Sequence, residues 1–100
     1  MKEEPKRPST AIDRATAQYE RLAKSADEVA RTVELSADVH EQMTDHNPRA
    51  AERAEDLRRL AAAEREAAAA YRRGETPSEE VQQTIRTRGH VPATDSAASS

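Results

Sequence analysis

The chain has 100 residues, which is the length of one small domain. It contains no cysteine, 16 basic and 19 acidic residues, and only two aromatic residues, both tyrosine. These counts exclude a disulfide framework, a thiolate metal site and a cysteine nucleophile, and they provide no net positive field for nucleic acid. No run of 18 apolar residues is present, so we expect no membrane span. Residues 1–8 are charged and lack the apolar core of a secretory signal, and we expect a cytoplasmic protein.

Alanine dominates the apolar residues. It occurs 20 times, whereas the chain has only five valines, four leucines and two isoleucines. Such small side chains bury little apolar area, while ordering the backbone carries its full entropic cost. A lone monomer should therefore be marginally stable, and contact with a second chain would stabilise it.

Residues 1–8 hold five charged residues and two prolines, and we interpret them as a flexible arm. From residue 10 to about residue 44 no glycine or proline interrupts the chain, and apolar residues recur at alternating spacings of three and four. This pattern predicts a long helix with a heptad-type stripe. The stripe consists of Ile12, Ala15, Tyr19, Leu22, Ala26, Val29 and Val33. Leu35, Val39 and Met43 form a second line around the helix, and we expect Leu35 and Val39 to be free for an outside contact.

Asn47 and Pro48 suit the cap and the first residue of a second helix, which we expect at residues 48–73. Because the break at residues 45–47 is short, the two helices should be antiparallel neighbours. We expect Leu22 to meet Tyr71, and Val33 to meet Leu60 or Ala61. The stripe of the second helix consists of Ala50, Ala54, Leu57, Ala61, Ala68 and Tyr71, with Leu60 at its edge.

Gly74 is typical of a helix end, and Thr76 followed by Pro77 and Glu79 predicts the start of a third helix at about residues 77–88. Val81 and Ile85 lie on one face of it. This helix could either cover the start of the first helix or fold back on the hairpin. Residues 90–100 have the composition of a disordered tail. The predicted fold is therefore all-α: an antiparallel helical hairpin with a short third helix over residues 9–89.

Charges are distributed unevenly along the two long helices. After Arg31 the charged residues of the first helix are all acidic, whereas the first charged residues of the second helix include Arg49 and Arg53. Each arrangement opposes its own helix dipole. A hairpin would bring the two ends together, so we expect Glu41 and Asp45 to pair with Arg49 and Arg53. The alternative is a solvated charged face.

No residue pattern favours catalysis or a cofactor. His40 and His46 lack the spacing of helical metal ligands. Ser36 and His40 could meet on one helical turn, but no residue would orient the imidazole of His40 and no group would stabilise an oxyanion. We therefore expect no enzyme activity, no metal, no cofactor and no small-molecule substrate. His40 near Arg53 could respond to pH.

The stretch from Val33 to Arg73 contains the phrases VHEQ, AERAEDLRR and AAAEREAAAAYRR. In these phrases it resembles short Ala/Arg/Glu-rich helical-hairpin proteins of high-GC actinobacteria, and the excess of arginine over lysine, 13 to 3, fits that background. The resemblance implies a helical hairpin and no particular activity.

The sequence also resembles the WXG100 secretion substrates, which are helical hairpins that pair into four-helix dimers. The run from Tyr71 to Glu75 matches their Y-x-x-x-D/E signal after the second helix, although the chain has no tryptophan and its turn reads Asp-His-Asn-Pro in place of W-x-G. This resemblance implies recognition roles for Tyr71 and Glu75. Packing against Leu22 is the alternative role for Tyr71.

The leading hypothesis is a small helical interaction protein that acts by helix–helix association, either with itself as a bundle or with a cognate helical partner. The alternatives are a WXG100-like secreted effector or carrier and a small nucleic-acid accessory protein; the acids among the second helix's arginines disfavour the latter. The expected core and interface residues are Ile12, Tyr19, Leu22, Val29, Val33, Leu35, Val39, Leu57, Leu60, Tyr71, Val81 and Ile85.

Overall fold

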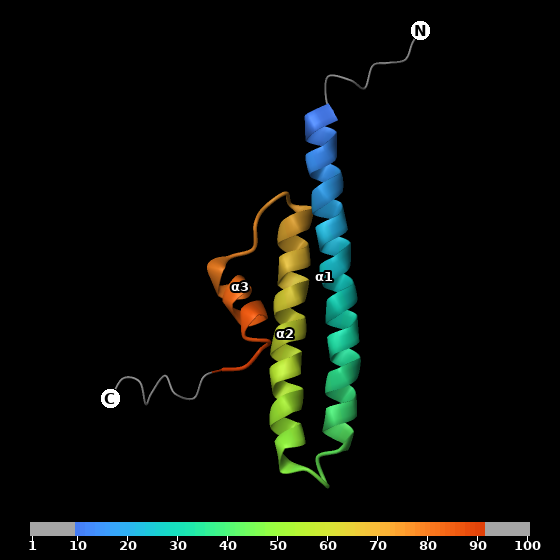
Figure 1. Cartoon of the computed structure of the whole chain (residues 1–100), viewed down its shortest axis with the longest axis vertical. Coiled ribbons are helices and arrows are strands. Elements are labelled where there is room, and N and C mark those ends of the chain that lie inside the picture. The colour runs from blue at the N-terminus through green and yellow to red at the C-terminus, as the bar shows by residue number, and fades with distance from the viewer. Residues whose placement is uncertain (1–9, 92–100) are drawn as a thin grey trace, which may run out of the picture.

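A computed structural model describes residues 10–91 of the chain (Figure 1). This part forms three helices and no strand: α1 (Thr10–Gln42), α2 (Pro48–Arg72) and α3 (Glu79–Arg86). The predicted all-α hairpin with a short third helix is confirmed. The predicted arm at residues 1–8 and residues 92–100 of the predicted tail lie outside the described residues. No helix within residues 10–91 combines the length and apolar character that a bilayer crossing requires.

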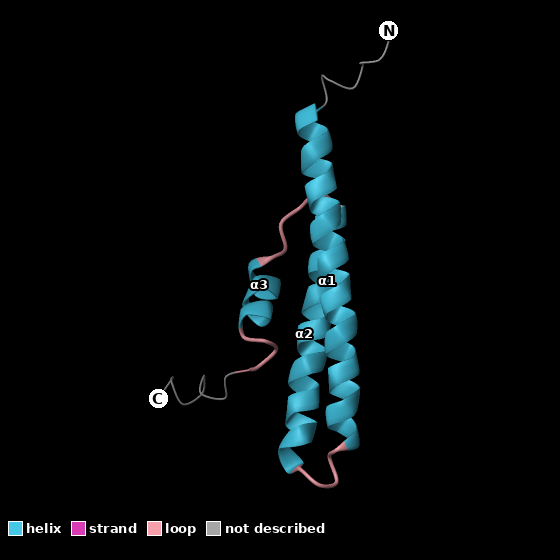
Figure 2. Cartoon of the chain, turned by 45° about the vertical axis from the view of Figure 1, so that its right-hand side comes forward, coloured by secondary structure: helices cyan, strands magenta, loops and turns pink. Residues whose placement is uncertain are grey.

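The turn between α1 and α2 is closed by the cap that the sequence predicts. Asn47 has an extended backbone, and its side-chain oxygen accepts a hydrogen bond from the backbone N–H of Arg49 at 3.0 Å. Pro48 follows at the first helical position, where no backbone donor is needed. The two long helices therefore run antiparallel and side by side (Figures 1 and 2).

Alanine fills the contact between α1 and α2. Small side chains at every seventh position of both helices let the two backbones approach closely, in the manner of an antiparallel coiled coil. Leu57, Tyr19, Tyr71 and Val33 fill the flanks of this contact, either buried or half-buried. The buried heptad alanines are Ala23, Ala30 and Ala37 on α1 and Ala54, Ala61 and Ala68 on α2.

The predicted stripe of α1 is wrong at Leu22 and Val29, which are 40% and 42% exposed. Ala23 and Ala30, one residue further along, occupy the contact instead, whereas Tyr19, Ala26 and Val33 of the predicted stripe stay buried or half-buried. A leucine in the contact would hold the helices further apart than the alanines of α2 favour. Tyr71 consequently packs against Tyr19, with ring centroids 6.2 Å apart, rather than against Leu22.

α3 folds back on α2 and does not cover the start of α1, which settles the position that the sequence leaves open (Figure 2). Val81 and Ile85 are half-buried, as their spacing predicts. The predicted cap at Thr76 is wrong: Ser78 caps the helix, and its hydroxyl accepts from the N–H of Val81 at 3.2 Å. Ser78 has an extended backbone, so the helix begins one residue after it. The face of α2 turned to α3 consists of Leu60, Ala63, Ala67 and Ala70, all buried.

The backbone of Gly89, just after α3, packs closely against α2. Its φ is +81°, and a Cβ built on it would lie 1.8 Å from the carbonyl oxygen of Asp56. The carbonyl of Gly89 accepts a hydrogen bond from Nε of Arg59 at 2.9 Å. Only glycine fits this position, because both its backbone conformation and its closeness to α2 exclude a side chain.

α1 extends beyond the end of α2. Tyr19 contacts Tyr71, which is one residue before α2 ends at Arg72. Residues 10–18 therefore form an overhang of the hairpin (Figure 1). Ile12, which the sequence predicts in the core, is exposed on this overhang because neither α2 nor α3 reaches it.

Candidate interaction surface

One side of α1 carries an uncharged strip along the whole helix, which we call the open face. Its residues follow alternating spacings of four and three, the spacing of a coiled-coil seam, and none of the ten is charged. In a chain with 35% charged residues, an uncharged run of this length stands out from the rest of the surface. The open face consists of Ala11, Ala15, Gln18, Leu22, Ser25, Val29, Thr32, Ser36 and Val39 on α1 and of Met43, the first residue after the helix.

The open face is solvent-exposed except at Ser36, which is partly buried. Its four large side chains, Leu22, Val29, Val39 and Met43, are between 40% and 54% exposed. Leu35 is exposed beside the strip. The prediction that Leu35 and Val39 leave the hairpin contact is therefore confirmed, and Leu22 and Val29 join them. These large apolar residues alternate with the small polar residues Ser25, Thr32 and Ser36 along one strip, which makes the strip a candidate interaction surface.

A row of ion pairs borders another side of α1. Arg65 donates hydrogen bonds to both carboxylate oxygens of Glu34, at 2.7 and 3.1 Å, and these hydrogen bonds lower the pKa of Glu34 below its ordinary value of 4.5. Arg72 binds Asp27 at 2.7 Å, one helical repeat further along α2. The ion pairs join α1 to α2 along one edge of the hairpin and leave the open face clear of charge.

The predicted partners of the acidic end of α1 are wrong. Glu41 pairs with Arg58 at 2.6 Å rather than with Arg49 or Arg53. Among residues 10–91, no ion pair of Asp45, Arg49 or Arg53 is found. The reason is helical phase: Arg58, Arg65 and Arg72 lie seven residues apart on the edge of α2 that faces the acids, whereas Arg49 and Arg53 point to another side.

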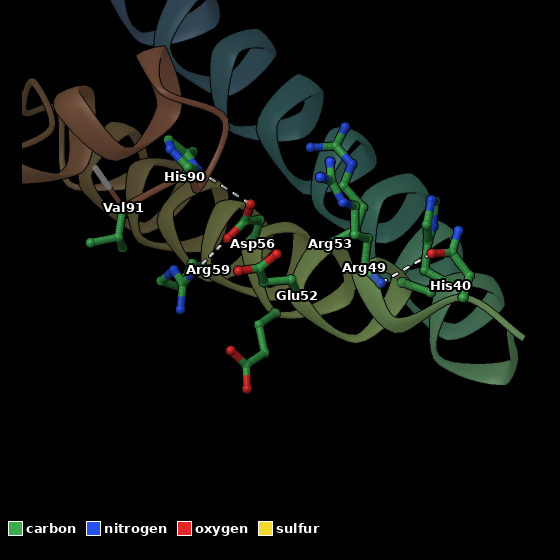
Figure 3. A pocket seen from close by; sticks show the side chains of 11 residues that line it. His40, Arg49, Glu52, Arg53, Asp56, Arg59, His90 and Val91 are labelled. Atoms are coloured by element: carbon green, nitrogen blue, oxygen red, sulfur yellow. Dashed lines mark hydrogen bonds and ion pairs between the residues drawn. The ribbon is translucent and has the colours of Figure 1, made fainter. Parts of the chain in front are cut away.

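Arg49 and Arg53 line a shallow pocket with His40, between the end of α1, the start of α2 and the segment after α3 (Figure 3). The Nδ1 atom of His40 lies 2.8 Å from the backbone carbonyl of Ser36, so the serine hydroxyl is not its partner in this contact. Asp56 stands at the opposite end, bound to Arg59. His40 and Arg53 are thus close, as the sequence predicts.

This pocket is a weak candidate for a ligand site. The carboxylate of Asp56 is bound by Arg59 at 2.5 Å and lies 3.6 Å from Nδ1 of His90 (Figure 3). The pocket is lined by equal numbers of acidic and arginine side chains, with Glu52 and Glu55 among the acids. It therefore attracts neither anions nor cations strongly. Within residues 10–91 no group of three or more His, Asp and Glu side chains could hold a metal ion.

The two residues of the secretion-like signal lie at the far end of the hairpin. Tyr71 is half-buried against Tyr19, which satisfies the packing role for its ring. Glu75 is exposed and pairs with Arg73 at 3.1 Å.

The open face does not emerge from the sequence as one continuous strip, because the large-residue stripe places Leu22 and Val29 in the hairpin contact. The signal that could have found it is the alanine repeat, since Ala23, Ala30 and Ala37 recur every seven residues. Once those alanines are placed inside, the neighbouring uncharged positions must lie outside.

Comparison with protein-family models, curated proteins and solved structures finds no match to this chain.

Proposed function

We propose that this protein is a non-enzymatic interaction protein that binds a helix of another chain along the open face of α1. The observation that carries the proposal is the run of ten uncharged positions on a side of α1 that α3 leaves uncovered. Two helices with strips at spacings of three and four can interdigitate their side chains over many turns. The open face has the pattern that such packing requires.

The free energy gained by burying the apolar side chains of the open face can be compared with the cost of association. Full burial of a large apolar side chain contributes roughly 1.5–3 kcal/mol. The four large residues of the open face are about half exposed, so covering them would contribute about 3–6 kcal/mol. An equally apolar partner surface would contribute a similar amount. The two surfaces together would contribute about 6–12 kcal/mol, which is of the same size as the cost of association in lost motion, about 4–15 kcal/mol.

Site-specific photo-crosslinking in cells that produce the protein tests this function. The photo-reactive residue p-benzoylphenylalanine replaces Val29 or Val39 on the open face. Ala51 and Ala69, which are exposed on α2, receive the same residue as matched controls. We expect an adduct of one discrete mass from both α1 positions and none from the two α2 positions.

Two results would contradict the proposal: no adduct from Val29 and Val39, or adducts of equal yield from the α2 positions. The mass of the adduct carries further information, because a second copy adds 11.0 kDa and a different chain adds its own mass. Binding by the open face is therefore tested separately from the identity of the partner.

A further inference from the structure

We propose that the helix bound along the open face is α1 of a second copy of this chain, packed antiparallel with Ser25 of one copy beside Val29 of the other. This inference rests on the proposed function and names its partner. In such a dimer α1 and its copy lie side by side at the centre.

Symmetry fixes the register of the pair. A two-fold axis relates the copies of a closed dimer, so in an antiparallel pair each residue faces the one at equal distance on the other side of the axis. The ten positions of the open face are symmetric about residue 27, so an axis there opposes every member to another member. The opposed pairs are Ala11 with Met43, Ala15 with Val39, Gln18 with Ser36, Leu22 with Thr32, and Ser25 with Val29.

Side-chain size supports this arrangement. Each of the four large residues of the open face meets a smaller one: Met43 and Val39 meet alanines, Leu22 meets a threonine and Val29 meets a serine. The two helices can therefore run at a constant separation with interdigitating side chains. A parallel pair would instead oppose alanine to alanine at one end and methionine to methionine at the other. Such a pair would splay, because its ends demand different separations.

Area supports a second copy as the occupant. From Ala11 to Met43 the open face is about 48 Å long at 1.5 Å per residue, and a helix contact is about 10 Å wide. The strip would thus bury about 500 Å² per copy and about 1,000 Å² in total, which reaches the lower limit for a specific interface. A shift of one heptad would leave Val39 and Met43, or Ala11 and Ala15, without an opposed member and would reduce this area.

The overhang of α1 has a place in this dimer. Residues 10–18 lie beyond the end of α2, and neither α2 nor α3 covers their share of the open face (Figure 1). In the proposed register Ala11 and Ala15 pack on the end of α1 in the other copy. α3 packs on α2 and makes no contact with α1 within residues 10–91 (Figures 1 and 2).

Chemical crosslinking of the full chain tests the register, because the protein contains no cysteine of its own. Ala15→Cys and Val39→Cys variants are prepared separately, mixed, and treated with a short bismaleimide. We expect crosslinked dimers from the mixture that join one variant to the other. Each variant alone should give almost none, because its two cysteines would stand about 36 Å apart along the helices. Both positions are exposed, so circular dichroism of each variant should match that of the parent chain.

A second measurement keeps the test independent of crosslinking chemistry. Val29→Glu should weaken the dimer about tenfold or more in sedimentation equilibrium, because it opposes a charge to the other copy at the centre of the strip. The matched control Ala51→Glu, on α2, should leave dimerisation unchanged.

Crosslinks within each variant alone would show a parallel pair and would overturn the proposal. A protein of 11.0 kDa at every concentration would also overturn it. If that monomer still forms adducts of another mass at Val29 and Val39 in cells, binding by the open face stands and self-association fails. If those positions form no adduct either, both proposals fail.

Discussion

Replacing Gly89 by alanine tests whether the close approach of its backbone holds α3 on α2. A left-handed residue other than glycine costs about 1–2 kcal/mol. Gly89 adopts that conformation, with φ of +81°, and its new methyl group would also lie 1.8 Å from the carbonyl oxygen of Asp56. The segment must therefore leave α2 and expose Leu60, whose burial contributes roughly 1.5–3 kcal/mol. The total expected loss is about 3–5 kcal/mol.

Gly74 provides the matched control. Its φ is +74°, yet nothing lies within 4 Å of a Cβ built on it, so Gly74→Ala should cost only about 1–2 kcal/mol. The reduced freedom of the unfolded chain offsets both losses equally. Urea unfolding followed by circular dichroism measures the two free energies, and hydrogen exchange at Val81 reports whether α3 has detached. Equal losses in the two variants would refute the role assigned to the contact between Gly89 and Asp56.

Three further predictions concern the contact of α1 with α2 and its charged border. Ala30→Leu should destabilise the hairpin by about 1–3 kcal/mol through overpacking, whereas the exposed Ala62→Leu should change stability by less than about 0.5 kcal/mol in the same urea titration. Glu34→Gln should lower the urea midpoint at pH 7, because a pKa lowered by folding means that the ionised group stabilises the fold. This difference should vanish as the pH falls through the pKa of Glu34 in the folded protein, and a constant difference would contradict it. Glu64→Gln should act in the opposite direction: burial raises the pKa of Glu64, so removing the charge should raise the midpoint at pH 7, with a smaller gain in acid.

The helices and their ends could be predicted because their signals are local. Asn47 and Pro48 satisfy the first backbone donors of α2 with atoms only two residues away, whatever the rest of the chain does. Gly74 takes the left-handed conformation that its position after a helix indicates. The shift of the third cap from Thr76 to Ser78 shows the limit of such signals, since either residue could supply the hydroxyl.

The buried side of α1 could not be predicted from residue size alone. Leu22 and Val29 have more apolar area than Ala23 and Ala30, so a stripe drawn through large residues favours the wrong side. Which side of α1 is buried depends on both helices at once, because the alanines buried on α2 pack closely only against an equally small surface on α1. The same helical phase directs Arg58 to Glu41, a partner that requires the rotation of both helices to be known.

The position of α3 depends on an approach between distant backbone atoms that no local pattern encodes. In the sequence, Gly89 reads only as the end of a helix. In the structure it meets the backbone of Asp56, 33 residues earlier in the chain. A glycine selected for closeness and one selected for a turn look the same in one sequence.

The division of residues between the two sides of α1 connects the fold to the proposed function. Alanines inside the hairpin draw α1 and α2 together but bury little area per residue, so this contact alone gives a small hydrophobic gain. The larger side chains Leu22, Val29, Val39 and Met43 lie on the open face, where their burial requires another helix. If the open face is covered by a second copy, the gain that stabilises the dimer also stabilises the hairpin, because only the folded α1 presents the strip. The free energy of unfolding should then rise with protein concentration, and a Val29→Glu variant should lose that dependence while retaining the helical content of its monomer.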